Sequence, residues 1–170
     1  MVKISLSPKF IKETIMLFWK KSLKEMLFGR RVILAETEKQ ALEWVHKHPD
    51  QFKEMGGRQG SFVKIDPIHK GLGAVYLLPN IIENKNTQTL LIFSEDTKIT
   101  NGPDLWVYLS KNIDIKKEGL GEYLDLGLIK GNKGGQLYII EKDITALREY
   151  RSAIIWCKQF SVLFTFAALS

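Results

Sequence analysis

The chain has 170 residues, of which 45% are hydrophobic and 26% charged, and it carries a net charge of +6 at pH 7. This balance is typical of a globular protein with a buried core, and it excludes bulk disorder. The single cysteine, Cys157, excludes an intrachain disulfide framework. Its thiol is left with three uses, which are packing, reaction or an intermolecular bridge.

The positive charge is concentrated near the N-terminus. Residues 1–31 hold eight Lys or Arg and two Glu, whereas residues 32–170 hold seventeen basic and seventeen acidic side chains. A basic stretch that contains aromatics predicts an anionic partner, unless it is simply the solvated face of a helix. A membrane surface suits it better than nucleic acid, because the rest of the chain is neutral and its aromatics are not interleaved with basic residues.

The first predicted element is an amphipathic helix over residues 8–28. Ser7 and Pro8 suit the N-cap and the first helical position, and Gly29 suits the end. Its apolar residues recur at spacings of three and four: Ile11, Ile15, Phe18, Trp19 and Met26. This face is expected to lie on the domain, on a partner or in a membrane interface. The longest apolar run is too short for a membrane span and poorly placed for a secretory signal.

A second helix is predicted to start near Thr37, where Thr37 and Gln40 have the spacing of a capping box, and to end at Pro49. His46 and His48 project to different sides of it, so they are expected to be surface residues rather than ligands of one metal ion. The glycines of residues 56–60 predict a linker. The expected division is therefore a two-helix extension, residues 1–56, followed by a domain, residues 57–170.

Beyond the linker the periodicity changes to short apolar segments separated by turns. The predicted strands are Ser61–Ile65, Gly73–Leu78, Thr89–Phe93, Leu105–Ser110, Gln136–Ile140, Ala153–Cys157 and a closing strand within Phe160–Leu169. Pro79 and Asn80 are expected to form a turn. Many short strands without intervening helices predict a mainly β fold, an antiparallel sandwich or barrel-like domain.

The catalytic and nucleotide-binding motifs with a known mechanism are missing from the sequence. The glycines near Lys133 lack the spacing of a phosphate-binding loop, and no serine lies in a nucleophile elbow. One cysteine and three histidines supply too few ligands for an ordinary zinc site, so no metal is expected. These observations favour a protein that is not an enzyme.

Cys157 is the residue with the most chemical potential. Alternation along its strand places Cys157 on one face with Ala153 and Ile155, and Trp156 and Lys158 on the other. From the residues alone, a small buried core side chain is the commoner role of such a thiol. His69, in a loop between two strands, is either an exposed loop residue or a group beside Cys157 that tunes the thiol or binds a cofactor.

An ordered set of segments in residues 60–170 resembles the electron-transfer DM-thirteen domain. The segments are Gly60–Phe62, His69–Gly71 leading to Ala74, Leu91–Phe93, Gly102–Leu105, Val107–Ser110, Asp125–Gly127, Ile129–Gly131, Ile155–Phe164 and Ala167–Leu169. The resemblance implies a β-sandwich module, usually extracytoplasmic or membrane-associated. It also implies a redox role for the family's characteristic cysteine, which aligns with Cys157.

Two functions follow as hypotheses. In the first, the domain is a redox or electron-transfer module in which Cys157 cycles as a thiol or ligates a haem, with His69 as a second cofactor contact and a partner protein or small thiol completing the cycle. In the second, it is a non-catalytic module that binds a ligand or protein, and Cys157 is structural. The expected contacts are then Gly102, Pro103, Asp104, Trp106 and Tyr108.

Overall fold

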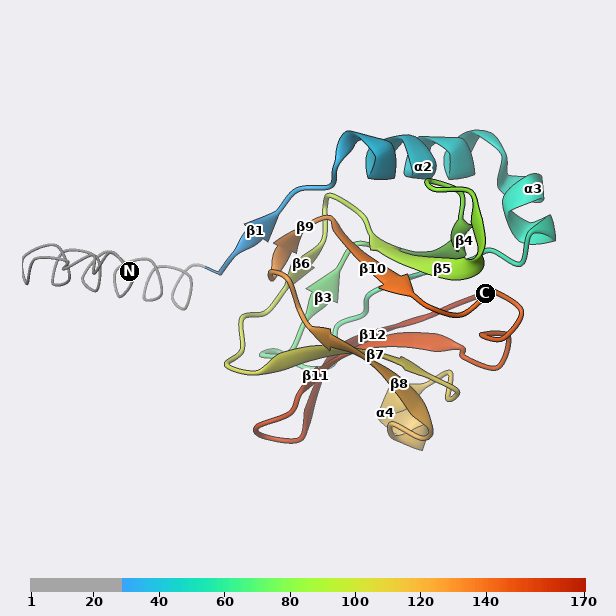
Figure 1. Cartoon of the computed structure of the whole chain (residues 1–170). Coiled ribbons are helices and arrows are strands. Elements are labelled where there is room, and N and C mark those ends of the chain that lie inside the picture. Colours follow the sequence, from blue (N-terminus) through green and yellow to red (C-terminus); the bar gives the residue numbers. More distant parts are fainter. Residues whose placement is uncertain (1–28) are drawn as a thin grey trace, which may run out of the picture.

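The computed structural model of the chain describes residues 29–170, which form three layers. Helices α2 (Glu36–Lys47) and α3 (Pro49–Glu54) cover one sheet, and a second sheet packs against the opposite face of the first (Figure 1). The largest apolar core therefore lies between the two sheets.

The sheet under the helices, called the helix-side sheet, is antiparallel with strand order β10-β5-β4-β2. Its strands are β2 (Arg58–Ser61), β4 (Ala74–Asn80), β5 (Lys85–Phe93) and β10 (Gln136–Ile140). The other sheet, called the cysteine sheet, is antiparallel with order β12-β11-β7-β8. Its strands are β7 (Leu105–Ser110), β8 (Tyr123–Leu128), β11 (Ser152–Cys157) and β12 (Val162–Ala168).

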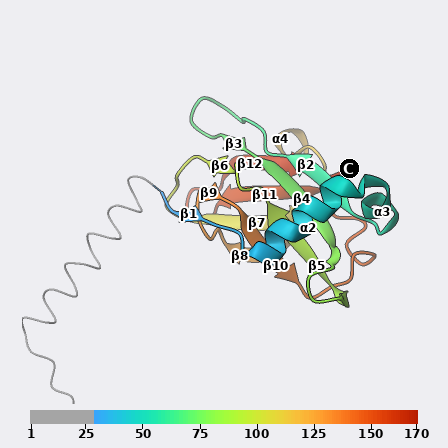
Figure 2. The same cartoon turned by 90° about the horizontal axis from the view of Figure 1, so that it is seen from above.

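A small third sheet, with order β1-β9-β6-β3, lies at one end of the sandwich. Its strands are β1 (Arg31–Val32), β3 (Gly71–Leu72), β6 (Lys98–Ile99) and β9 (Lys133–Gly134). Viewed from above in Figure 2, β1, β6 and β9 again lie together at that end. A short helix, α4 (Ile115–Glu118), precedes β8. The two main sheets meet at a corner, where Gln59 and Ser170 exchange two backbone hydrogen bonds of 3.1 and 3.0 Å.

Alternating apolar side chains fill the space between the sheets, as period-two strands require. They include Val75, Leu77, Leu91 and Phe93 from the helix-side sheet, and Val107, Leu109, Ala153, Ile155 and Cys157 from the cysteine sheet. All nine are fully buried. The predicted mainly β, antiparallel sandwich is confirmed, and its sheets do not close into a barrel.

Helix α2 begins one residue before Thr37, because Ala35 is its N-cap and Glu38 accepts a 2.8 Å hydrogen bond from the Ala35 amide. The predicted capping box of Thr37 and Gln40 is therefore wrong. The predicted end is confirmed, since α2 stops at Lys47 and Pro49 starts α3. His46 Nε2 lies 3.0 Å from Tyr76 Oη, whereas His48 Nδ1 lies 3.0 Å from the Trp44 carbonyl.

The two helices pack on the outer face of the helix-side sheet through a second apolar cluster. The cluster contains Leu34, Leu42, Val45, Phe52, Tyr76, Leu78, Leu90 and Ile92. Burial of this face is what holds helices of 12 and 6 residues, because helices of that length are marginal in isolation.

Some predicted strand boundaries are wrong. The strand expected at Ser61–Ile65 lies instead at Arg58–Ser61, so part of the predicted linker is strand. Pro79 and Asn80 end β4 rather than form a turn. The closing strand runs over Val162–Ala168, with a turn before it. The sequence pattern does not predict strand β8, because Asp125 and Gly127 interrupt its apolar residues.

The predicted helix over residues 8–28 lies outside the described residues, and so does the membrane contact expected of it. Over residues 29–170, no helix has the length and apolar character needed to cross a bilayer. The division of the chain at residues 56 and 57 stays a prediction.

Candidate functional site

Three connections of the sandwich are joined at one end, two of them on the ring of Phe164, in β12. They are the loop of residues 64–70, the loop of residues 100–104 and the turn of residues 158–161, and we call them together the loop end. The His69 ring lies 4.6 Å from the Phe164 ring in an edge-to-face arrangement. Gly102 lies so close to Phe164 that a Cβ there would come within 2.7 Å of Cζ. The Lys158 amide donates to the Asp104 carbonyl at 2.9 Å, which joins the turn to the second loop.

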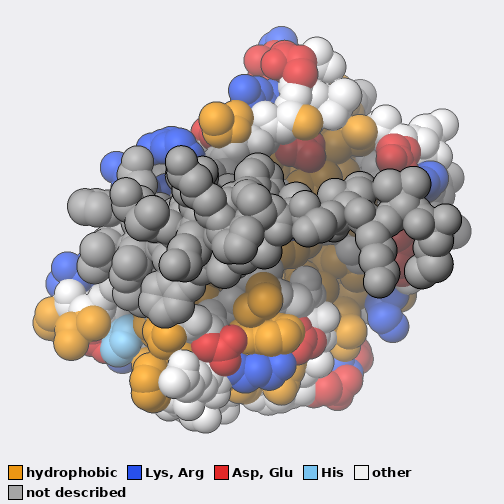
Figure 3. All heavy atoms as spheres, turned by 60° about the vertical axis from the view of Figure 1, so that its left-hand side comes forward, with side chains coloured by type: hydrophobic (Ala, Val, Ile, Leu, Met, Phe, Trp, Pro, Cys, Tyr) orange, Lys and Arg blue, Asp and Glu red, His pale blue; other side chains and the backbone are white. Residues whose placement is uncertain are grey.

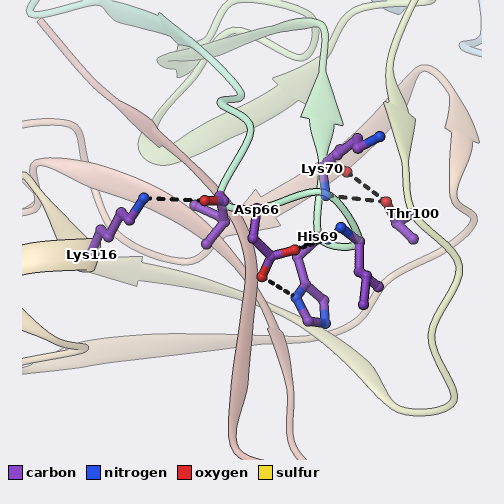
Figure 4. Close-up of polar contacts among 7 residues, drawn as sticks. Asp66, His69, Lys70, Thr100 and Lys116 are labelled. Carbon is purple, nitrogen blue, oxygen red and sulfur yellow. Dashed lines mark hydrogen bonds and ion pairs between the residues drawn. The ribbon is translucent and has the colours of Figure 1, made fainter.

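The loop of residues 64–70 is held by Asp66 and His69. Asp66 Oδ2 lies 2.7 Å from His69 Nδ1, and Asp66 Oδ1 accepts hydrogen bonds of 2.7 Å from the amides of Ile68 and His69. Figure 4 shows the two side chains facing each other, with Lys116 reaching in from α4 to the loop backbone. The hydrogen bond from the His69 side chain, followed by those from the amides, lowers the pKa of Asp66 to about 2.

The loop of residues 100–104 leads into Trp106, which is half-buried on the outer face of the cysteine sheet. Trp106 Nε1 donates a 2.7 Å hydrogen bond to Asp104 Oδ1. Lys158 Nζ lies 3.5 Å from the centroid of the Trp106 ring and 3.3 Å from Asp125 Oδ2. The cation therefore covers one face of the indole, an arrangement that is favourable for a tryptophan.

Cys157 is the last residue of β11, directly before the turn of residues 158–161. It is fully buried, with its strand partners Val162 and Leu105 on either side. The predicted alternation is confirmed, because Cys157 points into the core with Ala153 and Ile155 while Lys158 lies over Trp106 on the other face. The pairing of β11 with β12 shifts register between Ile155 and Trp156, close to the thiol.

The sequence comparison identifies the domain that contains these residues. A family model described as electron transfer DM13 matches residues 69–169. The chain belongs to the electron transfer DM13 family. The match starts at His69 and extends beyond Cys157, so it covers most of the loop end. No curated protein and no solved structure matches the chain.

The DM13 domain brings most of the predicted site residues to one end of the sandwich. His69 and Gly102 both contact Phe164, Asp104 holds Trp106, and Cys157 lies beside the turn that joins this group. Pro103 is exposed in the same loop. The prediction that Tyr108 is a binding contact at the surface is wrong, because this side chain is 1% exposed and stacks on Tyr123. Burial, with Asp125 and Tyr123 nearby, raises the pKa of Tyr108 to about 12.

Sequence reasoning missed the residues that organise this end. Phe164 lies in an apolar segment with nothing to distinguish it, and only the tertiary structure shows that two loops meet on it. Asp66 had a usable signal, because an aspartate three residues before a histidine in a loop favours capping of the following amides.

The packing around Cys157 does not fit a haem ligand in this conformation. A haem iron would need an open face at the sulfur, whereas Cys157 is enclosed by apolar side chains. A cavity of about 410 Å³ lies between α2 and the β4–β5 connection, and one of about 290 Å³ lies between the end of α3 and the segment near Ile144. A third, of about 150 Å³, is lined by the start of α2, the β4–β5 connection and β10. Neither Cys157 nor His69 lines any of the three. Among residues 29–170, no three His, Cys, Asp or Glu side chains are grouped to hold a metal ion.

Proposed function

We propose that this DM13 domain transfers electrons through Cys157, acting as a free thiol that exchanges with a disulfide of a partner protein or a small molecule. The observation that carries the proposal is the electron transfer family match over residues 69–169, in which Cys157 is the only cysteine. The thiol lies one residue from the exposed Lys158, so opening of a single turn would expose it.

The exchange balances without a cofactor. The deprotonated sulfur of Cys157 attacks one sulfur of an external disulfide, a new S–S bond forms as the old one breaks, and the departing sulfur takes up a proton. Cys157 is oxidised and the external sulfur is reduced. Because the chain has no second cysteine, a thiol from the partner or from solution resolves the mixed disulfide.

Access to the thiol depends on the β11–β12 turn. Cys157 is fully buried, so exchange requires local opening of the end of this hairpin. The register shift between Ile155 and Trp156 interrupts the ladder close to Cys157, and only the Trp156–Leu163 and Cys157–Val162 pairs follow it. The opening unit is therefore short.

Titration of the native protein with an aromatic disulfide reagent tests the proposal. We expect one thiol per chain to react in native buffer, at a rate that low urea changes little, because only local structure opens. Val162→Ala, next to the thiol, should speed the reaction about tenfold. Val45→Ala, a matched change in the other apolar cluster, should not. A thiol that reacts only on global unfolding would contradict the proposal.

The full burial of Cys157 favours a second candidate, a binding module in which the thiol is structural. Its contacts would be Pro103, Asp104 and Trp106, with Gly102 allowing the loop to pack on Phe164. The same titration separates the two functions. A binding module predicts an unreactive thiol, and the absorption spectrum of the purified protein tests the haem hypothesis directly, because a bound haem gives an intense visible band.

A further inference from the structure

The loop of residues 64–70 is internally hydrogen-bonded and exposes the side chain of Ile68 to solvent. The amides of Ile65 and Asp66 donate to the His69 carbonyl at 3.0 and 3.2 Å, and Asp66 caps the amides of Ile68 and His69. The loop is further tied to Thr100 through the Lys70 backbone and to Lys116 (Figure 4). Its tip nevertheless presents Ile68, which is 69% exposed, next to the exposed Pro67.

A second apolar tip lies on the neighbouring turn. Phe160 is 62% exposed between β11 and β12, and the base of its turn is held by the Lys158 amide on the Asp104 carbonyl. The bond to Asp104 joins this turn to the loop of residues 100–104, and that loop shares the Phe164 ring with the loop of residues 64–70. One exposed apolar side chain is ordinary for a protein surface, but two on adjoining connections need an explanation.

The surroundings of the tips are basic. Lys64 and Lys70 form the base of the first loop through an isolated bridge, and within residues 29–170 neither ammonium group forms an ion pair. The carboxylates of this end are Asp66, Asp104 and Asp125, and its lysines are Lys64, Lys70, Lys116 and Lys158. The four lysines outnumber the three carboxylates, so the balance of charge at these tips is positive.

The first described residues join the small third sheet, whose strands β3 and β6 flank the loops of residues 64–70 and 100–104. The carbonyl of the exposed Arg30 accepts a hydrogen bond from the Asn132 amide, which fixes residue 30 beside the small third sheet. Figure 3, which turns the left side of Figure 1 forward, shows hydrophobic side chains at the surface, interspersed with basic and acidic side chains and a histidine.

We propose that the loop end binds the surface of an anionic lipid bilayer, with Ile68 and Phe160 inserted among the acyl chains and Lys64 and Lys70 at the headgroups. Protruding apolar tips flanked by lysines match an interface that is apolar inside and anionic at its edge. The internal hydrogen bonds of the loop keep its backbone satisfied at the interface, where water is scarce. This inference does not depend on the thiol chemistry of Cys157.

Sedimentation of the full chain with vesicles tests the proposal. We expect binding to vesicles of phosphatidylcholine with about one-third phosphatidylglycerol, and little binding to pure phosphatidylcholine. Ile68→Ser and Phe160→Ser should each weaken the partition into vesicles about fivefold to tenfold, because each removes an apolar side chain that the bilayer would bury. Lys64→Gln and Lys70→Gln should each weaken it about fivefold, and high salt should weaken it further.

Ile139→Ser is the matched control, because Ile139 is 48% exposed on β10 and lies outside the loop end. It should leave vesicle binding unchanged. All these side chains are exposed, so unchanged thermal unfolding should confirm that each variant folds. Two results would overturn the proposal. One is a full chain that does not bind anionic vesicles, which would leave the tips as a protein contact. The other is binding that Ile68→Ser and Phe160→Ser do not weaken, which would assign it to the N-terminal stretch alone.

Discussion

At the scale of single residues, Asp66 shows how one carboxylate orders a whole loop. Its two oxygens satisfy two backbone amides and the ring of His69, so the loop needs no regular secondary structure. The histidine in turn packs on Phe164 and joins the loop to the core. His69 was a candidate from the sequence, but its partner and its position come from the fold.

The order of this loop should depend on pH. The pKa of Asp66 is lowered to about 2 by its hydrogen bonds to His69 and the amides, so the ionised form stabilises the folded loop. That contribution is complete above the ordinary value of 3.8 and is lost as the pH falls through about 2. We expect the amide resonances of Ile68 and His69 to change over this range in an NMR titration. Asp66→Asn should abolish the change, and its persistence in that variant would assign it to another group.

The burial of Cys157 makes a prediction about stability that is independent of its redox role. Cys157→Ala leaves a small apolar cavity and should cost about 1–2 kcal/mol of unfolding free energy. Cys157→Ser places a hydroxyl among apolar side chains and should cost about 1–3 kcal/mol more. Urea denaturation measures both changes. A serine variant as stable as the wild type would mean that the side chain is hydrated.

At the scale of elements, the sandwich depends on contacts where strands of different sheets cross. Strand β2 belongs to the helix-side sheet, but Gln59 also pairs with Ser170 beyond β12. The next residue, Gly60, lies so close to β12 that a Cβ on it would come 2.0 Å from the Ala168 carbonyl oxygen. The obstacle is backbone, so no side chain can move aside.

Gly60→Ala should therefore force the two sheets apart at this corner. We expect a loss of at least about 2 kcal/mol in unfolding free energy, because the clash is with main chain rather than with a flexible side chain. The neighbouring Ser61→Ala, at an exposed position of the same strand, is the control and should change stability little. Equal stability of the two variants in thermal unfolding would show that the corner is loose.

At the scale of the whole molecule, residues 29–170 combine the helices and the sandwich through a shared sheet. The helix-side sheet contributes Leu77 and Leu91 to the core between the sheets, and Leu78 and Leu90 to the cluster under α2. Because adjacent residues of the same strands serve both clusters, the clusters should unfold together.

Leu42→Ala tests this coupling. Leu42 is 8% exposed in the cluster under α2, and its truncation should cost about 2–4 kcal/mol. We expect one transition at a lower temperature, seen alike by circular dichroism and tryptophan fluorescence. Glu43→Ala, at a 68% exposed side chain on the same helix, should leave the transition in place. Separate melting of the helices in the Leu42 variant would contradict a shared unit and would support a boundary near residue 56.

The sequence by itself determined what depends on local periodicity. Alternation along Ala153–Cys157 was enough to turn the thiol inward, and the apolar stripe of α2 was enough to predict a helix that ends before Pro49. Only the tertiary structure decided which distant residues meet. The burial of the thiol between Val162 and Leu105, the joining of two loops on Phe164 and the position of Lys158 over Trp106 all depend on strand order and register. These depend on contacts between residues far apart in the chain, which local pattern does not encode.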